Sequence, residues 1–200
     1  MTLDETTDAA LWARATAGDG DAFTALYDRY GDRVHSYCFR RTASAAAAQD
    51  LTSAVWLEAW RGRGRAELHE DGSLAPWLFG IARNVIRNSE RTLRRHRAAL
   101  NRLPDPLDEP DHADLVTARL DDERRMAEVL AAVARLPKRE QDVLTLVAWA
   151  DLGQAEVAAA LGISVGTVKS RLSRARARLR AEHEPGLGTA TAPTTARRPE

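Results

Sequence analysis

Residues 154–180 read QAEVAAALGISVGTVKSRLSRARARLR, and the turn chemistry of this stretch leaves few folds open. Apolar residues recur at helical spacing from Gln154 until Gly162, a residue type that commonly ends helices. Ser164 then stands where the N-cap of a second helix belongs, and we expect that helix to begin near Gly166. A helix, a short glycine-containing turn and a second helix together predict a helix-turn-helix.

The second helix of this pair has one apolar and one polar face. The apolar stripe, which we assign to the core, consists of Val168, Leu172, Ala175 and Leu179. The opposite side carries Thr167, Ser170, Ser173 and Arg174, flanked by Lys169 and Arg176 on one side and by Arg171 and Arg178 on the other. Six cations and no acid lie in 166–180. Short polar side chains between cations predict a helix that reads base edges in the major groove while its flanks neutralise phosphates. The alternative is a solvated basic face on a helical hairpin.

Composition excludes several classes of protein. The 200 residues suffice for one or two domains, and 29 basic and 29 acidic residues give zero net charge. Cys38 is the only cysteine, which excludes an intramolecular disulfide, and no further ligands lie near Cys38 and His35 to complete a metal site. The sequence has neither a charged start followed by an apolar run nor a stretch of about 18 apolar residues, the length of a membrane span. We therefore expect a cytoplasmic protein with no membrane insertion, no metal and no cofactor.

Hydrophobic periodicity predicts helices in the N-terminal half at 9–16, 21–42, 44–61 and 76–97. Asp21 is suited to cap the second of these helices. The third helix is apolar on more than one face, and its remaining side carries Asp50, Ser53 and Leu57. Such a helix fits either a partner surface or a central helix that its own domain covers all round, and periodicity leaves both interpretations open.

The helix at 76–97 follows a loop with glycines and charges, and it has a basic face. Pro76 is suited to its first turn. The polar side gathers Arg83, Asn84, Arg87, Arg91 and Arg94, and seven arginines against one acid give 83–102 a local charge of +6. A basic face after an aromatic-bearing loop predicts contact with nucleic acid, because phosphates attract arginine and bases stack on aromatic rings. Trp77 and Phe79 are equally suited to be stacking platforms or core residues.

The segment at 101–123 has a different character. Three prolines, and eight acids against two arginines, give it a local charge of −6. Such a segment cannot bury a core, and we interpret it as a linker, either a solvated spacer or a mimic of nucleic acid that folds back on the basic domains. Beyond it, helices are predicted from Met126 to Leu136 and from Lys138 to Trp149, ahead of the helix-turn-helix. Residues 183–200 are low in complexity, and we expect them to be disordered.

These pieces, in this order, resemble the extracytoplasmic-function (ECF) group of the sigma-70 family of RNA polymerase sigma factors. AFTALYDRY, AQDLTSAVWLEAW and WLFGIARNVIRN are similar to successive segments of the region-two domain of that family. LPKREQDVLTLVAWADLGQAEVAAALGISVGTVKSRLSRARARLR is similar to the region-four pattern throughout, and GTVKSRLSRAR is among its most specific signatures. The resemblance implies an all-α fold of two small helical domains joined by a flexible acidic linker. The implied divisions are an N-terminal segment (1–20), region two (21–100), the linker (101–123), region four (124–182) and a tail (183–200).

The resemblance also implies roles for individual residues. The helix at 44–61 would dock on the coiled coil of the polymerase β′ subunit through Asp50, Leu51, Ser53 and Leu57. The loop at 65–75 and the helix after it would recognise and open the −10 element and hold a flipped base, with Trp77, Asn84, Arg87 and Arg91 as candidate residues. The second helix of the helix-turn-helix would read the −35 element through Thr167, Lys169, Ser170, Arg171 and Arg174, while Arg176 and Arg178 contact phosphates. Many family members have a phenylalanine-containing stretch ahead of this tryptophan and this chain does not, so the base-capturing residues stay open.

The partners implied are core RNA polymerase, through its β′ coiled coil and β flap, promoter DNA, and an anti-sigma factor. Catalytic residues are not expected, and we interpret the protein as a non-enzyme that is a monomer when free. The alternative is a stand-alone helix-turn-helix regulator, but such regulators usually dimerise to span two half-sites, and no clear dimerisation helix remains in this chain. An enzyme acting on nucleic acid would need a carboxylate cluster or metal ligands, whereas the histidines are scattered and the densest acids lie in the linker.

Overall fold

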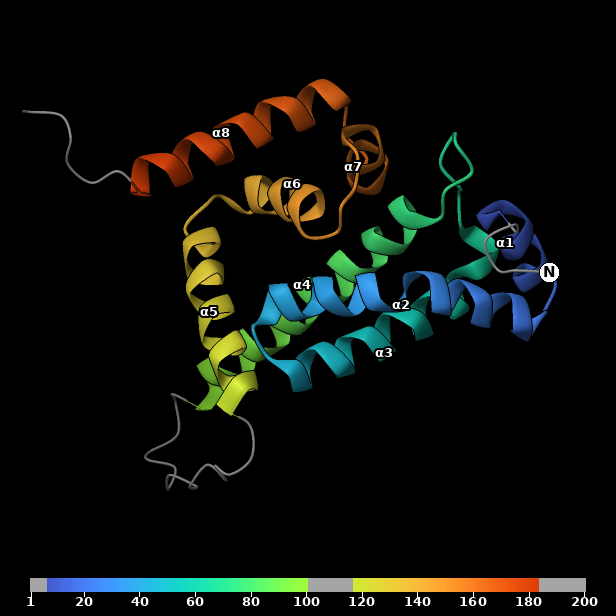
Figure 1. Cartoon of the computed structure of the whole chain (residues 1–200), viewed down its shortest axis with the longest axis horizontal. Coiled ribbons are helices and arrows are strands. Elements are labelled where there is room, and N and C mark those ends of the chain that lie inside the picture. The colour runs from blue at the N-terminus through green and yellow to red at the C-terminus, as the bar shows by residue number, and fades with distance from the viewer. Residues whose placement is uncertain (1–6, 101–116, 184–200) are drawn as a thin grey trace, which may run out of the picture.

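The computed structural model describes residues 7–100 and 117–183, and the regular structure of these residues is helical (Figure 1). The elements are α1 (Asp8–Thr16), α2 (Gly20–Thr42), α3 (Ala45–Gly62), the 3-10 helix η2 (Arg63–Arg65), α4 (Ala75–Leu100), α5 (Thr117–Ala134), α6 (Lys138–Ala148), α7 (Gln154–Leu161) and α8 (Val165–His183). This arrangement confirms the predicted all-α fold.

Capping residues explain where several helices begin and end. Ser44 caps α3, because its side chain accepts a hydrogen bond from the Ala47 N–H at 3.3 Å. The cap of α2 is Asp19 rather than the predicted Asp21, since the Asp19 carboxylate accepts from the backbone N–H groups of Asp21 and Ala22. The prediction was two residues late because both positions carry an aspartate, and Gly20 between them already has helical geometry.

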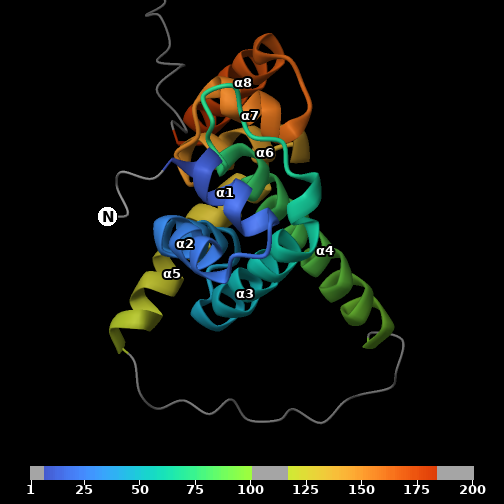
Figure 2. The ribbon, with the colours of Figure 1, turned by 90° about the vertical axis from the view of Figure 1, so that its right-hand side faces the viewer.

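The N-terminal helices enclose an aromatic core. Helices α2, α3 and α4 pack side by side, and α1 lies across one end of α2 (Figures 1 and 2). Tyr37 of α2 meets Phe79 of α4 edge to face, with ring centroids 5.6 Å apart, and both side chains are fully buried. Of the two aromatic residues that the sequence left as either stacking platforms or core residues, Phe79 is therefore a core residue.

The C-terminal helices form the helix-turn-helix where the sequence predicts it. Gly162 ends α7 in the left-handed conformation at φ 62°, and Ser164 caps α8 by accepting from the Thr167 N–H at 3.2 Å. Helix α5 begins at Thr117, so the last part of the predicted linker, 117–123, is helical. The rest of the linker and the residues after 183 lie outside the described residues.

The two groups of helices are in contact with each other. Helix α4 runs beneath α6 and α7 (Figure 1), and the apolar core continues from α2–α4 into α6–α8. At Gly80 of α4, an added Cβ would stand 3.4 Å from the carbonyl oxygen of Ala160 in α7. A Cβ at that distance would be in van der Waals contact with the carbonyl oxygen, so the two helices approach each other closely at this glycine.

Candidate nucleic-acid and partner interfaces

Helix α8 exposes the polar side chains that the sequence assigns to DNA. Val168, Leu172 and Ala175 are buried against α6 and α7. The solvent side carries Lys169, Ser170, Ser173, Arg174, Arg176 and Arg178, with Thr167 and Arg171 half-buried at its edges. The predicted division of the helix into a core stripe and a basic face is therefore confirmed. Its geometry fits insertion into a major groove.

A buried carboxylate from α6 holds two of these arginines. Glu140 is buried, and its carboxylate oxygens lie 3.2 Å from Arg178 Nε and 3.7 Å from Arg174 Nε. Both arginine side chains are more than half exposed, so they keep donors available for a ligand while Glu140 orients them. The sequence does not single out Glu140, because no basic residue lies three or four positions away from it along the chain.

A shallow hollow of about 240 Å³ runs between the start of α7 and the basic flank of α8. Lys169, Arg176 and Arg180 line it together with Gln154, the first residue of α7. Cations beside the positive end of a helix suit a phosphate group. This hollow supports the assignment of Arg176 to phosphate contacts and adds Arg180 to them.

A second hollow lies at the junction of α3, η2 and α4, and two of the predicted −10 residues line it. Its volume is about 320 Å³, the lower end of the range for ligand sites and a size that suits a single base. Trp77 and Asn84 line it, together with Glu58, Gly62, Arg65, Ile81, Val85 and Asn88. The half-buried ring of Trp77 supplies an aromatic wall, while Asn84, Asn88 and Arg65 supply donors and acceptors. Arg65 begins the loop at 65–75 that the resemblance assigns to the −10 element, whereas Asn88 was not among the predicted residues.

The other two predicted −10 residues, Arg87 and Arg91, lie farther along α4. Arg91 is exposed, whereas Arg87 faces α6. Asp142 of α6 is buried, and its Oδ2 atom lies 2.6 Å from Arg83 Nη2 and 3.6 Å from Arg87 Nη1. No sequence pattern selects this carboxylate, which links the basic face of α4 to the C-terminal helices.

Three of the four predicted docking residues share an exposed face of α3. Asp50 and Ser53 are exposed, and the Leu57 side chain is 48% exposed although it is large and apolar. Leu51 differs from the expectation, because its side chain is buried in the core. It follows Asp50 by one residue, about 100° around the helix, and so faces inward.

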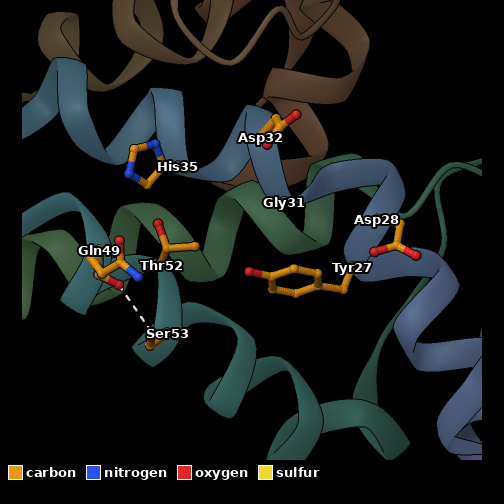
Figure 3. Close-up of a pocket in the computed structure, with 8 residues that line it drawn as sticks. All are labelled: Tyr27, Asp28, Gly31, Asp32, His35, Gln49, Thr52 and Ser53. Atoms are coloured by element: carbon orange, nitrogen blue, oxygen red, sulfur yellow. Dashed lines mark hydrogen bonds between the residues drawn. The ribbon is translucent and has the colours of Figure 1, made fainter. Parts of the chain in front are cut away.

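Beside this face, α2 and α3 enclose a hollow of about 370 Å³ (Figure 3). Tyr27, Asp28, Gly31, Asp32 and His35 line it from α2, and Gln49, Thr52 and Ser53 line it from α3. Asp28 and Asp32 make the hollow acidic, and Tyr27, which also lines it, is 46% exposed. An aromatic and acidic hollow that shares Ser53 with the exposed face of α3 fits a basic partner helix better than a nucleic acid.

The single cysteine of the chain, Cys38, lies in the core of the N-terminal helices. Cys38 is fully buried, and burial raises the pKa of its thiol to about 11. Within residues 7–100 and 117–183, we find no group of three or more side chains able to hold a metal ion. None of the helices in these ranges is long and apolar enough to cross a membrane.

Comparison with known proteins places the chain in a family. The profile for Sigma-70 region 2 matches residues 26–99, and that for Sigma-70, region 4 matches residues 126–179. RNA polymerase sigma factor HrpL of Pseudomonas syringae pv. syringae is 32% identical over 157 residues, which are 76% of this chain and 82% of HrpL. ECF RNA polymerase sigma factor SigM of Mycobacterium tuberculosis is 32% identical over 175 residues, 88% of this chain and 84% of SigM. The chain belongs to the ECF group of the sigma-70 family.

Other sigma factors extend the comparison. ECF RNA polymerase sigma factor BldN of Streptomyces coelicolor is 34% identical over 167 residues. The matched residues are 82% of this chain but only 61% of the length of BldN. Among solved structures, CnrH in complex with the cytosolic domain of CnrY has a TM-score of 0.64 at 27% identity, covering 88% of this chain and 96% of CnrH. The likeness to CnrH shows that this chain shares the fold of that solved structure.

Proposed function

We propose that this sigma factor joins core RNA polymerase, directs it to promoters by reading a −35 and a −10 element, and helps to open the DNA. The observation that carries the proposal is the presence of two separate basic surfaces, on α8 and on α4, in one member of this family. Exposed short polar side chains on α8 suit base readout in duplex DNA. The hollow beside Trp77 on α4 suits an unstacked base.

The proposal includes two protein partners. The exposed face of Asp50, Ser53 and Leu57, with the acidic hollow beside it, is assigned to the β′ coiled coil of the polymerase. A regulatory partner of the anti-sigma class, which the family resemblance implies, is included as well, and CnrH was itself solved with a partner, the cytosolic domain of CnrY. The protein would contribute no catalytic group, and it would act where the polymerase is, in the cytoplasm.

Transcription in vitro tests the proposal directly. Core polymerase, with and without the protein, is supplied with a pool of genomic promoter fragments, and the transcripts are sequenced. We expect discrete transcripts that require both components, with a shared pair of elements upstream of their start sites. A footprint of the protein alone on a palindromic site, without such transcripts, would instead support a stand-alone helix-turn-helix regulator.

On the promoters found in this way, Arg174→Ala should weaken recognition of the −35 element by about 1–3 kcal/mol and relax the sequence preference at one position. Arg176→Ala is the matched control, because the loss of a phosphate contact weakens all sequences alike. Holoenzyme affinity is measured on a panel of fragments with single substitutions in the −35 element. Unchanged affinity and preference for the Arg174 variant would refute its assignment to the −35 element.

The Asp50→Ala variant should lose affinity for core polymerase by about tenfold, or about 1.4 kcal/mol, while its circular dichroism spectrum stays unchanged. The carboxylate is exposed, so its loss removes a contact to the partner and leaves the core intact. Assembly with labelled core polymerase is titrated, and Asp121→Ala on α5 serves as an exposed control. Equal assembly of both variants with the polymerase would exclude Asp50 from the docking surface.

A further inference from the structure

Helix α1 carries a buried carboxylate that joins three parts of the chain. Asp8 is 8% exposed. Its Oδ1 atom accepts from Arg29 Nη1 of α2 at 2.5 Å, and its Oδ2 atom accepts from the Tyr30 hydroxyl and, at 2.8 Å, from the Leu74 backbone N–H. Burial, followed by the hydrogen bond to Asp8, raises the pKa of Tyr30 to about 12, so the phenol stays a donor at neutral pH. A buried charge with this many donors is well compensated.

Leu74 ends the segment that leads from η2 to α4. This segment contains a tight turn, in which the His69 N–H donates to the Ser73 carbonyl at 3.0 Å and the Gly72 N–H donates to the His69 carbonyl at 2.7 Å. Gly72 has a φ of 82°, which favours glycine. The turn is thus internally fixed, and the Leu74–Asp8 hydrogen bond sets where it joins the fully buried start of α4. Helix α1 lies beside this segment in both views (Figures 1 and 2).

The same helix also contacts the aromatic wall of the hollow proposed to hold a base. Trp12 is buried, and its ring meets that of Trp77 edge to face with centroids 5.0 Å apart. Trp77 lines the hollow of about 320 Å³ together with Arg65 and Asn84. Helix α1 therefore fixes the backbone entering α4 through Asp8 and a side chain of the hollow through Trp12. Both contacts come from residues ahead of the 26–99 range that matches region 2.

We infer that α1 is part of the −10 recognition site, with Asp8 as a positioning residue that holds the turn at 69–73 and the start of α4 in the conformation that receives the base. This inference rests on the proposed function and deepens it. Asp8 itself lies buried beneath the turn and makes no contact with DNA. Its effect passes through Leu74 and, by way of α1, through Trp77.

The test compares D8N with the unchanged chain, each assembled with core polymerase. An asparagine side chain keeps the volume of Asp8 but has only one acceptor oxygen. Its NH2 group must therefore point at donors, which are Arg29 in one orientation of the amide and Tyr30 and Leu74 in the other. We expect the affinity for a single-stranded non-template oligonucleotide carrying the −10 element to fall about tenfold, as expected for one unsatisfied buried donor. Affinity for core polymerase and for a duplex carrying only the −35 element should not change. The matched control is D21N, which makes the same chemical change at an exposed aspartate of α2.

The outcomes separate positioning from a purely structural role. Equal losses for core polymerase, the −35 duplex and the −10 oligonucleotide would overturn the inference, as would an unchanged −10 affinity. If D8N does not fold, Trp12→Phe takes its place, because it keeps an apolar ring while reducing the contact with Trp77. That variant should lose −10 affinity alone, and equal losses on all three ligands would overturn the inference as well. Failure of the unchanged holoenzyme to bind the −10 oligonucleotide would overturn the proposed function itself.

Discussion

Changing Asp142 to asparagine should raise the affinity of the isolated protein for DNA carrying the −10 element by about tenfold, if opening of the domains becomes easier by about 1.4 kcal/mol. The side chain of Asp142 is 7% exposed and lies 2.6 Å from Arg83 Nη2. It also lies 3.6 Å from Arg87 Nη1, and Arg87 is one of the residues assigned to the −10 element. This carboxylate compensates the positive charge of both guanidinium groups, so it lowers their attraction for a phosphate. Removal of the carboxylate charge therefore favours separation of α4 from α6.

Two measurements check this prediction. Fluorescence anisotropy gives the affinity for a labelled −10 oligonucleotide, and small-angle scattering should show a larger radius of gyration for Asp142→Asn. Glu128→Gln on α5 makes the same chemical change at an exposed carboxylate and should leave both quantities unaltered. A double-mutant cycle with Arg83→Ala should give a coupling energy of about 1–3 kcal/mol, since the two side chains are in contact. Independent effects of the two substitutions, or an unchanged radius, would contradict the prediction.

The sequence predicted the helices well because each depends on local signals. Periodicity located the starts of α2, α3 and α4 to within one residue, and the glycine and serine located the turn between α7 and α8. Helix α4 ends three residues later than predicted, at Leu100. The division of α8 into a core stripe and a basic face follows from the same periodicity. One capping residue was misplaced, at Asp19, where two aspartates of similar capping ability lie close together.

The contacts between distant segments were not predictable in the same way. Asp142 meets Arg83 across 59 residues, and Asp8 meets Leu74 across 66. No periodic pattern selects these two aspartates from the 29 acids of the chain, because their importance depends on how the helices pack. Leu51 shows the converse. The resemblance implies that it docks on the polymerase, whereas the angle of about 100° between successive residues of a helix turns its side chain into the core.

Changing Glu90 to alanine should destabilise the protein by about 3 kcal/mol, the cost of leaving a buried charge without its partner. Arg41 is that charge: its side chain is 3% exposed, and its Nη2 atom lies 3.0 Å from Glu90 Oε1. Glu90 also reaches Lys138 of α6 at 3.2 Å, so its loss removes a contact between α4 and the C-terminal helices. In a chain of 200 residues the midpoint of thermal unfolding should fall by about 6–12 °C. Glu58→Ala, which removes an exposed pair with Arg61, should cost less than about 0.5 kcal/mol.

The pH dependence of stability provides a second readout for Glu90. Burial opposes its ionisation, but Arg41 and Lys138 outweigh burial and hold the pKa of Glu90 below its ordinary value of 4.5. Because the folded-state pKa is depressed, this carboxylate contributes stability above its unfolded-state pKa, and the contribution is lost as the pH falls through the folded-state value. The gap in unfolding free energy between the unchanged protein and Glu90→Ala should therefore be widest near neutral pH and narrow below about pH 4.5. Chemical denaturation at a series of pH values measures that gap. A gap that stays constant on acidification would mean that Glu90 acts through packing rather than through its charge.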